Sequence, residues 1–179
     1  MESITISDVK IELKRGDIVG QRDIEAVVNA ANAQLRIGGG VAGAIHRAAG
    51  PGLAREAKPM APIKPGEAVI TSGHNLPNDY VIHCLGPVYG RDKPEEKLLA
   101  NCYRHGLDRA EENEIESIAF PAISTGAFGY PMEDAAHVAF NAVEARVEAG
   151  LSSVKLIRFV LWSKDAFNIH QQAMEEVFG

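Results

Sequence analysis

The stretch Val28-Asn-Ala-Ala-Asn32, followed by Gly38-Gly-Gly-Val41, decides how this chain is expected to fold. A short apolar run, residues 25–29, ends in asparagines and then in three consecutive glycines, after which residues 41–49 have the apolar spacing of a helix. Glycine allows the backbone to take positive φ and to approach a ligand closely. A helix start offers unpaired N–H groups to an anion. The pattern therefore favours a phosphate-binding loop between a buried strand and a helix, with a flexible turn as the alternative.

Strand-like and helix-like segments alternate along the rest of the chain. Residues 3–15 alternate apolar and polar side chains with a break at Ser7-Asp8, which predicts a hairpin or a bulged pair of strands. From residue 25 onward the alternation predicts a largely parallel sheet with helices on both faces, and the N-terminal segment adds antiparallel edge strands that make the sheet mixed. The expected strands are residues 25–29, 68–71, 80–85, 117–122 and 154–161, and the expected helices are 41–49 (ended by Gly50-Pro51), 94–113, 131–149 and 166–178.

Length and charge narrow the class of protein. The chain has 179 residues, which suits one α/β domain over residues 1–179 with a core of its own. The net charge of -6 argues against nucleic acid as a partner, because a protein that coats nucleic acid presents a basic face. A local phosphate site remains compatible with this charge, since backbone N–H groups bind phosphate without any net charge.

Cysteine usage and the absence of long apolar runs predict the compartment. Cys84 and Cys102 have no CxxC spacing, which argues against a disulfide framework and favours a reducing environment. No side chains show the spacing of metal ligands, so no metal is expected. The N-terminus lacks a basic leader and no segment reaches 18 apolar residues, so we expect a cytoplasmic protein without a membrane span.

A second polar loop follows another predicted strand. The segment Ser124-Thr125-Gly126-Ala127-Phe128-Gly129 offers hydroxyl and N–H donors directly after an apolar run. In an open α/β sheet, ligands bind beyond the carboxyl ends of the strands. Two such loops at one sheet edge suggest a ligand held between two walls, as a diphosphate would be. Phe128 is a candidate to pack against a sugar, with a core position as the alternative.

Several single residues have a functional and a structural interpretation. Asp17 is a candidate acceptor for an adenine amino group, with the Ile18 N–H on the ring, or else a turn aspartate. Trp162 is the only tryptophan and either stacks on a base or belongs to the core. Asn32 carries an amide that suits a ribose hydroxyl, or forms a turn. His46 lies on the helix that follows the glycines and is either catalytic or a core histidine.

These segments, in this order, resemble the macrodomain family. The resemblance extends over nearly the whole chain and implies a three-layer α/β/α sandwich around a mixed central sheet. It also implies ADP-ribose as ligand or product, no cofactor, and mono-ADP-ribosylated proteins as partners of a monomeric domain. The matching segments are Arg15-Gly-Asp-Ile18, Val28-Asn-Ala-Ala-Asn32, Gly38-Gly-Gly-Val41, Ala44-Ile-His-Arg-Ala-Ala-Gly50, His83-Cys-Leu-Gly-Pro87, Phe120-Pro-Ala-Ile-Ser-Thr-Gly126 and Phe128-Gly-Tyr-Pro131.

The resemblance implies a role for each candidate residue. Asp17 and the Ile18 N–H are expected to hold the adenine, and Trp162 is expected to stack on it. Asn32 is expected to contact the distal ribose near the scissile bond. The residues expected to enclose the diphosphate and distal ribose are Gly39, Gly40, Val41, Ser124, Thr125, Gly126, Ala127 and Phe128. The candidate catalytic residues are Asn32, His46 and Gly40.

One residue departs from the hydrolytic branch of the family. That branch reads Gly-Gly-Gly-Val-Asp, and its aspartate is thought to activate or position the attacking water, but here the fifth position is Ala42. A ligand phosphate and backbone groups can orient a water instead. We favour a hydrolase that removes mono-ADP-ribose from acidic side chains, with O-acetyl-ADP-ribose as a further candidate substrate. A non-catalytic reader of ADP-ribose is the alternative, and an unrelated nucleotide-binding or RNA-binding domain is a third.

Overall fold

The alternating N-terminal segment folds as a hairpin of β1 (Ser3–Ile6) and β2 (Val9–Arg15) in the computed structural model, which describes residues 1–179. Ser7 and Asp8 form the two-residue turn, and both have positive φ, 48° and 67°. Positive φ at both turn residues matches the right-handed twist of the flanking strands. The hairpin predicted from the alternation is confirmed.

Seven strands form one mixed sheet in the order β1-β2-β7-β6-β3-β5-β4. The five inner strands run parallel to one another, and β1 and β4 are antiparallel at the two edges. The remaining strands are β3 (Ala26–Ala30), β4 (Ala68–Ser72), β5 (Tyr80–Cys84), β6 (Ser117–Phe120) and β7 (Leu156–Leu161).

Two pairings differ from the expected sheet, which is largely parallel with antiparallel edge strands added by the N-terminal segment. β2 is parallel to β7, and β4 is antiparallel to β5 at the far edge. Residues 73–79 join β4 to β5, and this connection is too short for a crossover, which takes a dozen or more residues. A short link therefore forces a hairpin here.

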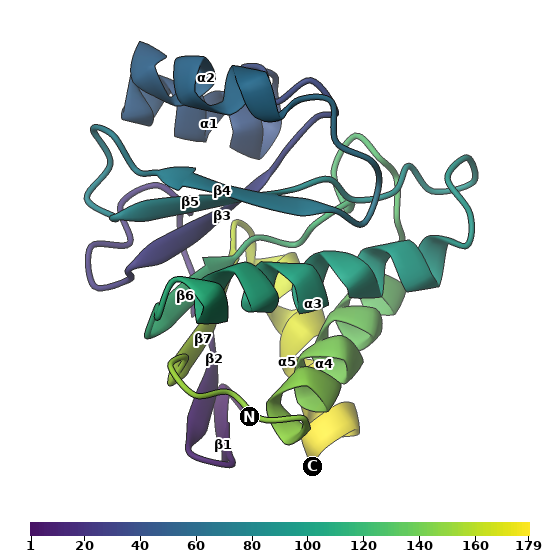
Figure 1. The fold of residues 1–179 in the computed structure, drawn as a ribbon. Helices are drawn as coiled ribbons and strands as arrows, with labels where there is room; N and C mark the ends of the chain where they lie inside the picture. The colour runs from purple at the N-terminus through teal and green to yellow at the C-terminus, as the bar shows by residue number, and fades with distance from the viewer.

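Helices cover both faces of the sheet, as Figure 1 shows. The helices α1 (Gly40–Ala49) and α2 (Pro51–Ala57) lie on one face. The helices α3 (Glu95–Glu112), α4 (Met132–Glu148) and α5 (Lys164–Phe178) lie on the other, and a 3-10 turn, η1 (Lys58–Met60), follows α2. This confirms the three-layer α/β/α sandwich. No helix has both the length and the apolar character needed to cross a membrane.

Helix α2 was not expected from the sequence. Gly50 ends α1 with a φ of 83°, and Pro51 was interpreted only as a terminator. Proline is equally suited to the first position of a helix, because its missing N–H has no partner there in any case. Here Pro51 opens α2, so the same dipeptide ends one helix and starts the next.

The four strands β3, β5, β6 and β7 divide their side chains between two cores. On β3, Ala26 and Val28 pack in the large core beneath α3, α4 and α5, while Val27 packs in a smaller core with Ile45 and Leu53 of α1 and α2. Because both faces of these four strands are buried, their sequences read as nearly continuous apolar runs, whereas β2 buries one face only and alternates. The carboxyl ends of these strands then open toward one edge of the sheet.

A buried arginine ties the loop after β2 to the sheet. Arg158 on β7 lies opposite Glu12 on β2, and its Nε donates to the Glu12 carboxylate at 2.9 Å. The same guanidinium donates to both oxygens of Asp23 at 2.8 and 2.6 Å and to the side chain of Gln21 at 3.0 Å. Gln21 in turn donates to the Asp17 carbonyl at 2.6 Å. The position of Asp17 is therefore linked to the centre of the sheet.

Candidate functional site

A cavity of about 310 Å³ lies beyond the carboxyl ends of β3, β5 and β6. Two loops form its walls: residues 38–42, which follow β3, and residues 123–128, which follow β6. The rest of the lining, near the strand ends, is Ala30, Ala31, Asn32, Gly86 and Ala122. Because small residues dominate this lining, the backbone of both loops is accessible to a ligand.

The first wall is the start of α1. The helix begins at Gly40, which has a φ of +54°, and its cap residue Gly39 makes no side-chain capping bond. The first turn carries no acidic side chain. The N–H groups and the positive dipole end of this helix are therefore free to face an anion.

Close packing holds the glycine loop against the helix. A Cβ atom at Gly43 would overlap the Gly38 carbonyl oxygen, and a Cβ at Gly38 would lie 3.3 Å from the Asn32 amide nitrogen. Only glycine permits this approach of the loop to the first turn of α1. The start of the glycine loop, at Gly38, therefore packs closely against both Asn32 and the first turn of α1.

Asn32 lines the cavity, and its side chain supports the loop that follows it. Its amide nitrogen donates to the Arg36 carbonyl at 2.8 Å, and its amide oxygen accepts from the Arg36 N–H at 3.0 Å. Both halves of the amide thus bond to the backbone four residues ahead. A ribose hydroxyl that bonds this amide would share or replace one of these bonds.

The second wall contains a buried hydroxyl without a protein partner. Ser124 has a φ of 69°, and its Oγ lies buried beside Gly86 with no hydrogen bond. Buried polar groups are nearly always paired, so an unpaired one at a cavity is a candidate ligand contact. Thr125 instead donates to the Ala122 carbonyl at 2.7 Å and does not line the cavity, whereas Phe128 lines it.

Asp17 and Trp162 lie together but outside this cavity. The Gly16 N–H donates to the Leu161 carbonyl at 3.0 Å, which places the two residues after β2 and β7 on neighbouring chain segments. The Asp17 carboxylate is exposed and accepts from the Val19 N–H at 3.0 Å. Trp162 is 75% exposed, which excludes the alternative of a core tryptophan.

Ile18 contributes its side chain to the smaller core. The residue is 6% exposed and packs with the apolar side chains beneath α1 and α2. Its side chain therefore cannot contact a ligand at the sheet edge. Only its backbone N–H, the group implied by the resemblance, is relevant to binding.

His46 lies on the buried face of α1 and does not line the cavity. It lies one helical turn after Ala42, which does line it, and its Nε2 has no hydrogen-bond partner. Burial lowers the pKa of His46 below its usual value, so the ring is neutral at physiological pH. Its ring centroid is 6.5 Å from that of His83.

His83 belongs to a buried polar cluster on the sheet. Its Nδ1 lies 3.1 Å from the Asn29 amide nitrogen and its Nε2 lies 2.9 Å from the Thr71 hydroxyl. Burial lowers the pKa of His83 to about 3, so it stays neutral. The Asn29 amide oxygen has no partner, which makes this cluster incompletely paired beneath the site.

Sequence reasoning missed some residues of the cavity. Gly86 and Ile123 line it but were not among the candidate residues. A signal for Gly86 existed, because a glycine directly after a predicted strand marks a close backbone approach. No group of three or more His, Cys, Asp or Glu side chains is placed to hold a metal ion.

Comparisons with known proteins point to one family. The family model described as Macro domain matches residues 28–139. A macro domain-containing protein of Methanosarcina mazei is 46% identical over 169 residues, covering 94% of this chain and 89% of the relative. The human protein named ADP-ribose glycohydrolase MACROD2 is 43% identical over 175 residues, covering 95% of this chain but 40% of the relative.

Solved structures agree. The Oceanobacillus iheyensis macrodomain with ADP superposes with a TM-score of 0.92 at 38% identity, covering 98% of this chain and 95% of that chain. The Trypanosoma brucei macrodomain in complex with ADP-ribose gives a TM-score of 0.84 at 36% identity, covering 92% and 68%. The similarity thus includes both the sequence and the whole three-layer arrangement.

Proposed function

Because the chain belongs to the Macro domain family, we propose that it binds ADP-ribose and hydrolyses the bond that joins ADP-ribose to acidic side chains of modified proteins. The observation that carries the proposal is the cavity of about 310 Å³ between the uncapped start of α1 and the loop that contains Ser124. Two walls of backbone donors suit a diphosphate, whose charge the helix dipole favours.

The ligand extends along the carboxyl edge of the sheet. The adenine lies at Asp17 and Trp162, beyond β2 and β7, and the diphosphate lies beyond β6 and β3. These four strands are consecutive in the sheet, so the centres of the two sites are two strand spacings apart, about 10 Å at roughly 4.8 Å per strand. An extended ligand with a base, a diphosphate and a second sugar suits this separation, and the second sugar reaches Asn32.

The residues of this chain position a water for hydrolysis. Water attacks either the ribose carbon that carries the acyl group or the acyl carbon itself. The bond between the attacked carbon and the ester oxygen breaks. The products are free ADP-ribose and the free carboxylate of the acceptor side chain. Asn32 and the backbone of Gly40 orient the distal ribose and the water, and His46, neutral and one turn further along α1, is the third candidate catalytic residue. Positioning and preorganised donors supply the rate enhancement in place of a general base.

Two comparisons support these assignments. Related structures are described with ADP and with ADP-ribose, and a relative is named as an ADP-ribose glycohydrolase. The chain spans about two fifths of the length of that relative, and we propose that the two share the activity named for the relative. O-acetyl-ADP-ribose is a second proposed substrate, because it carries the same ADP-ribose ester. The two free, buried cysteines support a reducing, cytoplasmic setting, and we propose a monomer.

Ala42 favours a second function, that of a reader without turnover. It lines the cavity at the position where the hydrolytic branch carries an aspartate, and a methyl group neither accepts a proton nor orients water. The loss of a general base commonly costs about 10²–10⁴-fold in rate. A reader would bind ADP-ribosylated protein through the same cavity and release it unchanged.

An assay of ADP-ribose release separates the two functions. A protein automodified on glutamate and aspartate is incubated with the domain, and free ADP-ribose is measured over time. We expect release above the rate without protein, and Asn32→Ala should lower release more than it lowers ADP-ribose affinity. Asn168→Ala on exposed α5 is the matched control. Release no faster than without protein would assign the reader function.

A further inference from the structure

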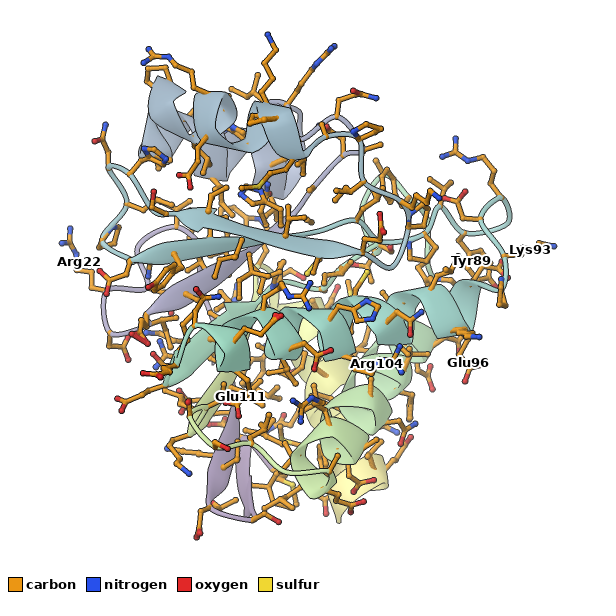
Figure 2. The ribbon with its side chains drawn as sticks, viewed as in Figure 1. Arg22, Tyr89, Lys93, Glu96, Arg104 and Glu111 are labelled. Carbon is orange, nitrogen blue, oxygen red and sulfur yellow. The ribbon has the colours of Figure 1, made fainter.

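A second groove lies between the N-terminal ends of α3 and α4. Its residues include Tyr89, Glu95, Glu96, Tyr130, Asp134 and His137. Figure 2 shows Tyr89 and Glu96 at this end of α3, while Arg22 lies at the opposite end of the molecule. Nothing in the proposed binding of ADP-ribose uses this groove.

A buried tyrosine presents an unpaired hydroxyl to the groove. Tyr130 is only 5% exposed, yet its hydroxyl forms no hydrogen bond with the protein. Burial, together with Glu96 and Glu95, raises the pKa of Tyr130 to about 12, so the hydroxyl stays protonated. Its oxygen is therefore an acceptor and its proton a donor, both available to a ligand in the groove.

An exposed aromatic ring forms the rim. Tyr89 is 45% exposed and packs edge to face against Tyr130, with ring centroids 4.9 Å apart. The face of an accessible tyrosine ring attracts an ammonium or guanidinium group. The rim therefore offers a cation both an aromatic surface and, next to it, a hydroxyl oxygen.

The charge of the groove is negative. Glu96 and Asp134 make no ion pair or hydrogen bond, and Glu95 uses one oxygen for the Gly90 N–H at 2.9 Å. The one basic group in the lining, His137, is already paired with Glu176 at 2.6 Å. The unpaired carboxylates of this groove therefore favour a positively charged ligand.

The N-terminal end of a helix normally attracts anions, but acidic side chains already neutralise this attraction at the starts of α3 and α4. Glu95 and Glu96 lie in the first turn of α3, and Glu133 and Asp134 lie in the first turn of α4. Their carboxylates satisfy the dipoles. A bound anion would face them at close range, so the charge pattern selects a cation.

The groove adjoins the proposed ADP-ribose cavity through one loop. Phe128 lines the cavity, and its carbonyl accepts from the Tyr89 N–H at 2.9 Å at the rim of the groove. Phe128 and Tyr130 are two residues apart, so their Cα atoms are separated by at most about 7 Å. A protein whose ADP-ribose occupies the cavity therefore brings its neighbouring residues within reach of the groove.

We infer that this groove binds a lysine or arginine side chain of the protein that carries the ADP-ribose. The cation lies over Tyr89, faces Glu96 and Asp134, and donates a hydrogen bond to the Tyr130 hydroxyl oxygen. The inference rests on the proposed function, because the ADP-ribose must occupy the neighbouring cavity. It assigns a sequence preference: acceptor sites with a basic residue near the modified side chain bind more tightly.

Binding of defined peptides tests the inference. Three synthetic peptides carry one mono-ADP-ribose on a glutamate, flanked by lysine and arginine, by glutamine, or by aspartate. We expect the basic peptide to bind about two- to fivefold more tightly than the neutral one, the upper part of the range for an exposed ion pair. The difference should shrink at high salt because exposed charges are screened. Equal affinity of the three peptides would overturn the inference.

Variants locate the preference. Glu96→Gln combined with Asp134→Asn should abolish the difference between basic and neutral peptides, and Tyr130→Phe should reduce it. Glu148→Gln combined with Glu114→Gln, two exposed carboxylates at the far end of α4 and just after the far end of α3, is the control with the same change in net charge. If the control variant lowers the preference as much as the groove variants do, general charge explains it and the groove does not.

Binding of free ADP-ribose tests the proposed function independently of the groove. Its affinity should be the same in the wild type and in all groove variants. Failure of the wild type to bind free ADP-ribose contradicts the proposed function itself. Normal binding of free ADP-ribose without any preference among the peptides contradicts the groove alone.

Discussion

Ala42 is the residue on which the catalytic proposal depends most. Its methyl group lines the cavity in the first turn of α1, one turn before buried His46. A carboxylate there would face the same space as the ligand, beside the helix dipole that favours its charge. In the proposed mechanism, a carboxylate at this position would supply the general base that Ala42 does not.

Ala42→Asp is expected to raise the rate of ADP-ribose release by about 10²-fold, since general-base catalysis typically contributes 10²–10⁴-fold. Single-turnover release from a glutamate-modified peptide measures the rate, and calorimetry measures ADP-ribose affinity. Ala42→Asn, which has the same shape without a titratable group, should stay near the wild-type rate. An aspartate variant no faster than the asparagine variant would contradict a role for the missing base.

The sequence predicted these residues unequally. The glycines at 38–40 and most of the loop at 124–128 line the cavity, and the sequence indicated both segments because small and polar residues follow an apolar run in each. The exposure of Trp162 was not predictable, because a tryptophan at a strand end fits either the core or a ligand. The unpaired hydroxyl of Ser124 and the two hydrogen bonds between the Asn32 amide and the Arg36 backbone depend on loop geometry, which residue spacing does not encode.

At the scale of elements, helix α1 and the loop before it act as one unit. Gly43 lies inside the helix, where alanine alone would stabilise by about 1 kcal/mol. A Cβ at this position, however, would overlap the Gly38 carbonyl oxygen. The contact between the loop and the helix therefore requires glycine at position 43, although glycine weakens the interior of a helix.

Gly43→Ala should therefore destabilise the domain by about 1–3 kcal/mol, the usual cost of overpacking, and weaken ADP-ribose binding. Thermal unfolding and calorimetry measure the two effects. Gly39→Ala is the control for stability, because a Cβ at Gly39 has no atom within 4 Å. A Gly43→Ala protein with unchanged or higher stability would show that the loop moves freely away from the helix.

The elements themselves were largely predictable, and the two failures have physical reasons. Helix α2 escaped prediction because Gly50-Pro51 is both a stop signal and a start signal, and the choice depends on the burial of Leu53 in the smaller core. The antiparallel direction of β4 escaped because strand direction depends on the connection. The short link at residues 73–79 contained the needed signal.

At the scale of the whole molecule, Arg158 links the central sheet to the loop that carries Asp17. The guanidinium bonds Glu12 and Asp23 from a buried position. This interaction, opposed by partial burial, lowers the pKa of Asp23 from 3.8 to about 2. A lowered carboxylate pKa means that the stabilising contribution is complete above about pH 5 and is lost as the pH falls through 2.

Asp23→Asn should therefore lower the Tm at pH 7, by about 2–4 °C for each kcal/mol lost in a domain of this size. The difference in Tm between wild type and variant should shrink as the pH falls from 4 to 2. Glu148→Gln, an exposed carboxylate without a partner, should show no such dependence. A difference that stays constant between pH 7 and pH 2 would mean that the charge of Asp23 does not stabilise the fold.

Titration calorimetry with free ADP-ribose tests the central claim most directly, since every catalytic and recognition proposal requires this ligand in the cavity. We predict saturable one-to-one binding in the micromolar range, about -8 kcal/mol, with weaker binding of ADP and weaker binding by Asp17→Ala. No saturable binding at protein concentrations well above this range, or equal affinity for ADP and ADP-ribose, would contradict the account.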